Sequence, residues 1–484
     1  MDSSTTFVWS GQQSYRLRST QHSGLGVSVL IFALAAIVVT AIGVSETLLR
    51  AIMIAGVAIA IFLPLIYRSA KGTLDLFEPL VPSALAASVM FVGRPIADQA
   101  LSSYLHLGYN IRPTFDWALF SVVIGIVAFN LGYSSNLGRP LRRLFPVPAT
   151  QFPIGMVATG AITMSILGAA LFGVFLLSNG GARALLIIVS GRNHTAATFT
   201  RQSTGYLYEA INLLLPASLL FFGLWMRTKR IHNLFFAAFT GVPLFLYQAS
   251  IGDRSELLPL IFGLPAIYYL WESRRPHLGR LLFAGLFLLI TFALLREIRN
   301  SAAAGRQHLG DSVMLTDPGK ALASTFTKDD SEMFDTFCNL VSVVPSTLPF
   351  HPFGLFSDIS IRALPRILFP DKPLEWSDEL IVTLWPQHYR LSRASSASSI
   401  FGNFYLYGGI PAIAFWSFIM GISFRQTWNW YLIYENNLNA ILLYSLVPSL
   451  VIVLWRGTVT GLLGHMFFTV VPLVLMQLFI RIRT

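Results

Sequence analysis

Residues 154–177 read IGMVATGAITMSILGAALFGVFLL and contain no charged side chain. This length matches the ~20 apolar residues that a helix needs to cross the hydrocarbon core of a bilayer. Similar apolar runs recur along the chain and predict about twelve spans. We place them at 26–44, 51–67, 77–91, 117–133, 154–177, 210–226, 233–251, 257–271, 281–295, 400–423, 437–454 and 460–480. Because lipid offers the backbone no hydrogen-bond partners, each span is predicted to be a helix.

The composition of the 484-residue chain indicates the same fold class. Hydrophobic residues make up 54% of the chain and charged residues only 12%, with a mean hydropathy of +0.63. Soluble domains carry about 25% charged residues, so this balance excludes a soluble enzyme, a disordered chain and a nucleic-acid-binding module. Cys338 is the single cysteine, which excludes an intrachain disulfide and a thiol-based metal site. The sequence therefore predicts an all-α integral membrane protein.

The basic residues divide unequally between the two sets of loops. One set, together with both tails, holds sixteen: Arg16, Arg18, Arg68, Lys71, Arg139, Arg142, Arg143, Arg227, Lys229, Arg230, Arg274, Arg275, Arg280, Arg425, Arg481 and Arg483. The short loops of the other set hold eight: Arg50, Arg94, Arg112, Arg183, Arg192, Arg201, Arg254 and Arg456. Since cytoplasmic loops carry the excess of Lys and Arg, both termini are predicted to be cytoplasmic.

This orientation divides the chain into four segments. We predict a cytoplasmic tail at 1–25, a bundle of about nine spans at 26–295, and a C-terminal bundle of about three spans at 400–484. Residues 296–399 then form one large external loop between the two bundles. Loops of this length are usually either functional or disordered, so this one is a candidate for part of the functional site.

The eight basic residues in the short external loops are all arginines, although lysine would anchor helices equally well. The planar fork of arginine binds phosphate and carboxylate groups in bidentate fashion, which favours an anionic ligand. Alternatively, each arginine caps a helix end or pairs with an acid such as Glu209, Asp253 or Glu256. For the whole set this alternative explains less, because few external acids lie near the membrane.

The long loop contains patterns typical of ordered structure. Met333, Phe337, Leu340 and Val344 have helical spacing and predict a helix over 331–344. Further on, apolar residues of the stretch 361–368 fall on one face of a helix. Arg362 and Arg366 fall on the other face. The pattern indicates either an interfacial helix whose arginines meet head groups, or a helix that packs over the bundle. His351 and Asp371 are acid/base candidates, although the acidic run that begins at Asp371 could also be a solvated face.

Several chemical motifs are absent from the sequence. We find no phosphate-binding glycine-rich loop with its lysine, no zinc-binding His/Glu helix and no nucleophile elbow. We therefore expect no cofactor and no metal. Within the spans we identify only Glu78, near one end, and His465 as ionisable groups. Ion-coupled transporters usually need ionisable groups near mid-membrane, so this scarcity argues against such a pump.

Four short motifs carry a family resemblance. They are DLFEPLVPS at 75–83 followed by RP at 94–95, Gly252-Asp253-Arg254-Ser255, LPRILFPDKP at 364–373, and FGNFYLYGGI at 401–410. With the span layout and the late external loop, the chain resembles bacterial oligosaccharide-repeat-unit polymerases of the Wzy type. Some members carry an Arg-x10-Gly pattern in two external loops. Arg299 and Gly310 fit it here, but no arginine of the loop 178–209 does.

The resemblance implies a fold similar to other lipid-linked, GT-C-type glycosyltransferases, with a large external loop over a helical bundle. It also implies an activity in the bacterial inner membrane. Such enzymes move a growing glycan from an undecaprenyl diphosphate carrier onto the terminal hydroxyl of a new lipid-linked repeat unit. The implied partners are this lipid-linked oligosaccharide, the bilayer and a protein that regulates chain length, but no nucleic acid.

This activity needs an electropositive site for the leaving diphosphate and a hydrogen-bond acceptor for the attacking hydroxyl. We predict that the diphosphate is bound by arginines of the external loops: Arg254, Arg192, Arg201, Arg366 and Arg299. His351 and Asp371 are the predicted catalytic residues, which orient the acceptor hydroxyl. Arg254 combines its place before an apolar span with a motif of the resembling family.

Two other functions remain open from the sequence. An O-antigen ligase of similar build transfers the finished glycan onto a lipid A core, and sequence features barely separate it from a polymerase. A transporter or flippase of lipid-linked sugar belongs to a different class. It predicts internal repeats and charged residues lining the bundle, and it needs no structured external loop.

Overall fold

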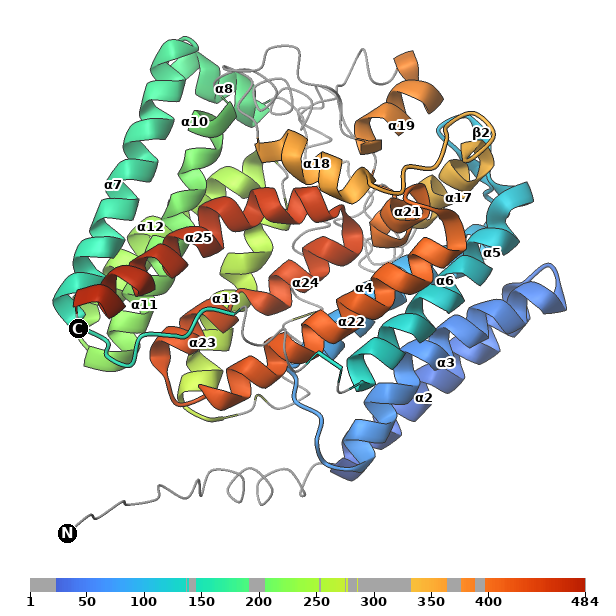
Figure 1. Ribbon diagram of the computed structural model, residues 1–484, viewed down its shortest axis with the longest axis horizontal. Helices are drawn as coiled ribbons and strands as arrows, with labels where there is room; N and C mark the ends of the chain where they lie inside the picture. Colours follow the sequence, from blue (N-terminus) through green and yellow to red (C-terminus); the bar gives the residue numbers. More distant parts are fainter. Residues whose placement is uncertain are drawn as a thin grey trace, which may run out of the picture.

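Figure 1 shows the computed structural model of the chain, which is built almost entirely of helices. The structure describes residues 23–483 except 136, 139–144, 191–204, 252–253, 275, 277–284, 286–331, 364–375 and 388–396. Within this part, nine helices are long and apolar enough to cross a membrane: Val27–Val44, Leu48–Ala70, Leu80–Ala100, Arg112–Ser134, Ile154–Ser178, Tyr206–Thr228, Ile231–Ile251, Leu438–Arg456 and Val459–Arg483. The chain is thus an all-α, multi-pass membrane protein, as the composition predicts.

The main helices of the bundle are, in chain order, α2 (Ser23–Val44), α3 (Leu48–Ala70), α4 (Leu80–Ser88), α5 (Arg94–Ala100), α6 (Arg112–Ser134), α7 (Ile154–Ser178), α11 (Leu214–Thr228), α12 (Ile231–Ile251), α13 (Arg254–Trp271), α22 (Gly409–Ile433), α23 (Leu438–Tyr444), α24 (Val447–Arg456) and α25 (Val459–Arg483). The shorter elements are η1 (Val89–Gly93), β1 (Leu105–His106), β2 (Tyr109–Asn110), α8 (Ala182–Ser190), α10 (Gly205–Glu209), η3 (Ala210–Leu213), α17 (Met333–Val343), α18 (Gly354–Ala363), α19 (Trp376–Leu384) and α21 (Ser399–Leu406). The predicted span at 281–295 lies outside the described residues, apart from residue 285.

The third span differs from its prediction. The sequence places it at 77–91, with Arg94 in an external loop, because the apolar run stops there. In the structure α4 continues through the single π-helical turn η1 into α5, so that the span runs over Leu80–Ala100. Such turns occur inside otherwise regular helices, frequently at functional sites. Arg94 is therefore a buried residue within a helix, and its placement in a loop was wrong.

The bundle is organised around two apolar cores. The first joins α3, α4, α6, α21 and α22 to α17 of the long loop, and the second joins α7, α11, α12, α13 and α23 to α25. Glycines allow α6 and α22 to pack backbone against backbone. A Cβ added at Gly132 would lie 2.0 Å from the carbonyl oxygen of Phe418, and one added at Gly421 would lie 2.1 Å from that of Phe129. Small residues at helix crossings serve this purpose in membranes.

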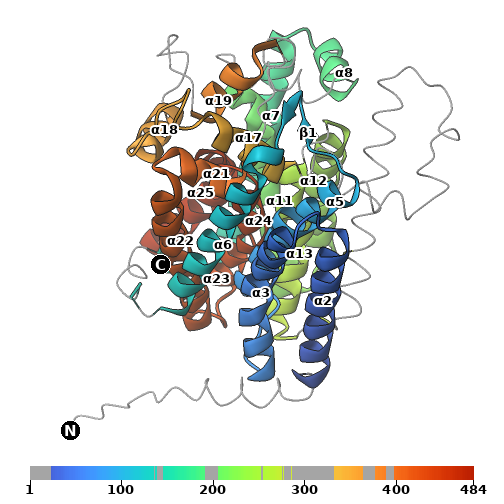
Figure 2. The same ribbon diagram turned by 90° about the vertical axis from the view of Figure 1, so that its right-hand side faces the viewer.

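Helices α17, α18 and α19 gather with the β1–β2 hairpin at one end of the bundle, which we call the loop end (Figures 1 and 2). The start of α2 and the end of α25 lie at the other end, which we call the opposite end (Figure 1). Five described arginines of the external set lie on elements of the loop end: Arg50, Arg94, Arg112, Arg183 and Arg254. Arg456 lies deeper in the bundle, since the adjacent Trp455 packs on Phe129 of α6. The described cytoplasmic set includes Arg68, Arg227, Arg425 and Arg481 at the opposite end. Apart from Arg456, these described members of the two predicted sets are thus separated in space.

The long loop packs on the bundle through ordered helices. The predicted helix over 331–344 is confirmed as α17, and Phe334, Phe337 and Cys338 on it are fully buried. The predicted helix at 361–368 overlaps only the last residues of α18, which begins earlier, at Gly354. The face that was predicted from Arg366 lies outside the described residues.

Candidate functional site

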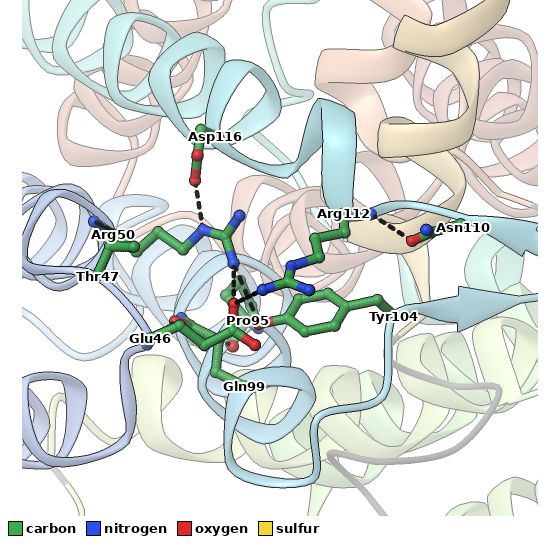
Figure 3. Close-up of polar contacts among 9 residues, drawn as sticks. All are labelled: Glu46, Thr47, Arg50, Pro95, Gln99, Tyr104, Asn110, Arg112 and Asp116. Carbon is green, nitrogen blue, oxygen red and sulfur yellow. Dashed lines mark hydrogen bonds and ion pairs between the residues drawn. The ribbon is translucent and has the colours of Figure 1, made fainter.

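Arg50 and Arg112 form a polar cluster at the loop end, where α2, α3, α5 and α6 meet (Figure 3). Nε of Arg50 lies 2.7 Å from the Asp116 carboxylate, and its Nη1 lies 2.9 Å from Glu46. Arg112 Nη2 contacts the same Glu46 oxygen at 3.0 Å. Tyr104 lies below both guanidinium groups, with each guanidinium carbon 5.6 Å from its ring centre. The carboxylates of Glu46 and Asp116 thus serve as counter-ions for these arginines, which link the helix ends.

Arg94 is the centre of a second, fully buried cluster. Its Nε lies 3.0 Å from Asp98, one turn further along α5, and its Nη2 lies 2.5 Å from Asp335 on α17. All three side chains are 7% exposed or less. His106 completes the cluster through a 3.2 Å contact with the hydroxyl of Thr336. A buried charge is costly unless it is paired, and the partner of Arg94 in the long loop is Asp335. The ion pair therefore anchors the long loop to the bundle.

The docking of the long loop extends beyond Arg94. The hydroxyl of Thr114 donates to the Cys338 carbonyl at 2.9 Å. Tyr109, in the hairpin, donates to the carbonyl of Leu384 at 2.8 Å, and Trp385 returns a bond to the Leu107 carbonyl at 3.1 Å. Three parts of the chain, α5, the β1–β2 hairpin and α6, thus hold α17 and the end of α19 at the loop end.

These clusters settle the role of three of the eight external arginines. Arg50, Arg94 and Arg112 pair with acids, so the expectation that few acids lie near them was wrong. Arg183 is exposed on α8, and Arg456 is half-buried at the end of α24. The predicted site residues Arg192, Arg201, Arg299, Arg366 and Asp371 lie outside the described residues. Arg254 opens α13 at the loop end, as predicted, although its side chain is outside the described part.

A carboxylate and an imidazole meet close to Arg254. Glu256 lies in the first turn of α13, and its Oε1 is 2.8 Å from Nδ1 of His465 on α25. The two side chains are 10% and 16% exposed, respectively. The contact has ion-pair distance without the alignment of a good hydrogen bond. Catalytic contacts are often poorly aligned before substrate binds, so this geometry fits an acid/base pair.

The long loop contacts α25 through α18. Helix α18 packs on α25, the helix that carries His465 (Figure 1). His351, the predicted catalytic residue that the structure describes, lies just before α18. Its backbone N–H donates to the carbonyl of Leu406 at 2.9 Å, and its carbonyl accepts from Gly354 at 2.8 Å. The backbone at His351 is therefore fixed against the end of α21.

The chemistry of this arrangement follows from its residue types. A carboxylate on one imidazole nitrogen orients the ring and stabilises its protonated form, which leaves the other nitrogen to accept a proton. Glu256 lies in the first turn of α13, and helix N-termini attract anions. Within the described ranges, no group of three His, Cys, Asp or Glu residues lies close enough together to hold a metal ion.

Sequence analysis noted both Glu256 and His465, but it did not predict that they are in contact. His465 stood out as an ionisable group in an apolar span, and Glu256 as an acid beside Arg254. Only the packing of α13, α24 and α25 brings them together. Searches with protein-family models, against curated proteins and against solved structures find no match to this chain.

Proposed function

We propose that this protein is a glycosyltransferase that polymerises oligosaccharide repeat units carried on undecaprenyl diphosphate in the bacterial inner membrane. The observation that carries the proposal is the contact between Glu256 and His465 at the loop end, on the helix that Arg254 opens. The site faces the periplasm in this proposal. The separation of most described arginines of the two sets between the ends of the bundle supports that orientation.

Each group has a role in the proposed transfer. His465 accepts the proton of the acceptor hydroxyl while Glu256 stabilises the resulting imidazolium. The acceptor oxygen then bonds to the anomeric carbon of the donor glycan as the bond from that carbon to the carrier diphosphate breaks. Arg254 and the start of α13 stabilise the negative charge that develops on the diphosphate. No cofactor takes part.

The other predicted residues keep supporting roles in this proposal. Further contacts to the diphosphate come from Arg192, Arg201, Arg299 and Arg366. His351 and Asp371 orient the acceptor beside the reacting hydroxyl. A regulator of chain length is the proposed protein partner.

Substitution of Arg254 tests the diphosphate contact. Arg254→Ala is expected to lower the rate of polymer formation by about a hundredfold or more, because it removes a charge-assisted contact to a developing anion. Arg254→Lys should rescue poorly, since it keeps the charge but loses the planar fork. The measurement is polymer length in cells, with the abundance of each variant in the membrane quantified beside it.

The two roles of Arg254 give different results in that measurement. Normal abundance with short product supports diphosphate binding. Normal abundance with normal polymer would remove Arg254 from the site. Low abundance of both variants would favour a structural role in pairing with Asp253 or Glu256.

Cysteine labelling tests the proposed orientation. The native Cys338 is fully buried, so a membrane-impermeant maleimide should not reach it in the folded protein. Burial also raises the pKa of this thiol, which further slows its reaction. Thr347→Cys, at an exposed loop-end position, should instead be labelled in cells with only the outer membrane permeabilised.

The matched control is Arg230→Cys, which is exposed at the opposite end of the bundle. It should be labelled only after the inner membrane is broken. If the two positions are labelled in the reverse order, the orientation is wrong, and the loop end faces the cytoplasm.

A transporter of lipid-linked sugar is the second candidate, and one observation favours it. The spans contain more ionisable groups than the sequence indicated, since Arg94 and Asp98 lie within the span Leu80–Ala100. Buried charges often line the path of a transported substrate. Arg94, however, is bonded to both acids of its cluster, and the cluster anchors α17. A transporter would move lipid-linked repeat units without joining them. The length of the glycan after incubation with the protein therefore distinguishes the two functions.

A further inference from the structure

A hollow of about 650 Å³ opens at the opposite end of the bundle, far from Glu256 and His465. This volume lies within the ~300–1,000 Å³ that is common for small-molecule sites. Its wall comes from five parts of the chain: the segment before α7, the ends of α11, α13 and α22, and the turn into α23. Because so many elements converge there, the hollow is a property of the fold and not of one loop.

Hydrogen bonds fix the wall of this hollow. The side-chain amide of Asn437 donates to the carbonyl of Ala149 at 2.9 Å. Asn439 donates to the same carbonyl at 2.8 Å and to the carbonyl of Gln151 at 2.9 Å. The turn into α23 is thereby tied to the segment before α7. The hollow is consequently formed before any ligand binds, which reduces the ordering cost of binding.

One charged side chain, Arg227 at the end of α11, lies among the described residues that line the hollow. Arg227 is exposed, and the structure records no ion pair for it within the described ranges. Two acids adjoin the aromatic wall in the sequence, Glu272 beside Trp271 and the half-buried Glu435 beside Tyr434. Glu272 is paired, with its Oε1 3.2 Å from Nζ of Lys229. Among the described residues, no acid therefore holds the guanidinium of Arg227 in an ion pair.

The other lining residues can contact an organic group attached to an anion that binds Arg227. Trp271 and Tyr434 are half-buried and present large rings, and Asn436 adds an exposed amide. Arginine binds phosphate in bidentate fashion, whereas aromatic rings contact sugars or hydrocarbon. Lys229 and Arg274 lie near the same helix ends and add positive potential that attracts anions.

We infer that this hollow binds a phosphate ester, with the phosphate on Arg227 and the organic part against Trp271 and Tyr434. The ester is either the head group of an anionic phospholipid or a soluble sugar phosphate, since both offer the same phosphate chemistry. The site is separate from the pair at the loop end. Its test therefore does not depend on the proposed transfer.

The experiment measures binding to the full-length protein purified in detergent. One arm uses native mass spectrometry to compare phosphatidylglycerol with diacylglycerol, which lacks the phosphate. The other arm uses equilibrium dialysis to compare radiolabelled glucose 1-phosphate with glucose. We expect the phosphate-bearing member to bind better in at least one arm. Arg227→Gln should weaken that binding about tenfold or more, through loss of a charge-assisted hydrogen bond.

Arg230→Gln is the matched control, because Arg230 is exposed at the same end but does not line the hollow. It should leave the affinity within about twofold of the wild type, whereas Arg227→Lys should restore part of it. A preference in the first arm assigns a lipid head group, and one in the second arm assigns a soluble ester. No preference in either arm, or an equal loss in Arg227→Gln and Arg230→Gln, would overturn the inference.

Discussion

Replacement of Arg94 by alanine is expected to lower the free energy of unfolding by about 3–5 kcal/mol, the cost of removing one partner from a buried ion pair. The change leaves two carboxylates, Asp98 and Asp335, buried without their shared cation. It also releases the anchor between α5 and α17, so the long loop should leave the bundle more often. Equilibrium unfolding in detergent measures the first effect, and limited proteolysis of the loop measures the second.

Arg112→Ala provides the control for this prediction. The Arg112 side chain is 59% exposed, and its contact with Glu46 lies at the surface of the loop end. Exposed pairs contribute only about 0–1 kcal/mol, so this variant should unfold almost like the wild type. Equal stability of Arg94→Ala and Arg112→Ala would show that the buried cluster does not hold the loop in place.

The second large effect is expected on activity. His465→Ala should lower the rate of glycan transfer by about 10²–10⁴-fold, the usual contribution of a positioned acid/base group. Glu256→Gln keeps the shape of the carboxylate but not its charge, so it cannot stabilise the imidazolium and should fall between His465→Ala and the wild type. Initial rates with purified protein and lipid-linked repeat units measure both variants.

Stability must be separated from chemistry in these variants. Phe467→Leu changes an exposed residue on the same helix and should keep both normal abundance and normal rate. If His465→Ala is as abundant and as active as Phe467→Leu, the pair of Glu256 and His465 is structural. Another group at the loop end must then accept the proton.

The overall fold was predictable wherever the signal is local. An uncharged run such as 154–177 can only be a membrane helix, because its backbone must satisfy its own hydrogen bonds. The helix α17 was predictable for a similar reason. Met333, Phe337 and Leu340 repeat at helical spacing, and the structure buries them together with all the residues between them.

The predictions failed where a buried polar residue is paired with a residue that is distant in the sequence. Arg94 looked like the end of a span, because a lone charge is not expected inside a membrane. It is tolerated within α5 because Asp335, from the far side of the sequence, neutralises it. Neither residue alone indicates the pair. The same applies to Glu256 and His465, whose types were visible but whose contact depends on the packing of α13 against its neighbours.

The sequence analysis also assigned too many arginines to the binding of an anionic ligand. Arg50, Arg94 and Arg112 have their counter-ions in the protein, supplied by acids on neighbouring helix ends. This leaves fewer arginines of the described part for a diphosphate and gives Arg254 greater weight in the proposal. Its backbone lies at the start of α13, two residues before Glu256 in the sequence.

The most direct test of the central claim is the product made by the purified protein in liposomes. The only substrate supplied is the undecaprenyl-diphosphate-linked repeat unit, without nucleotide sugar, ATP or divalent metal. We expect a ladder of longer lipid-linked glycans, separated by one repeat unit, which His465→Ala fails to form. Failure of the wild type to extend the repeat unit, or an absolute requirement for a nucleotide sugar, would contradict the proposed function.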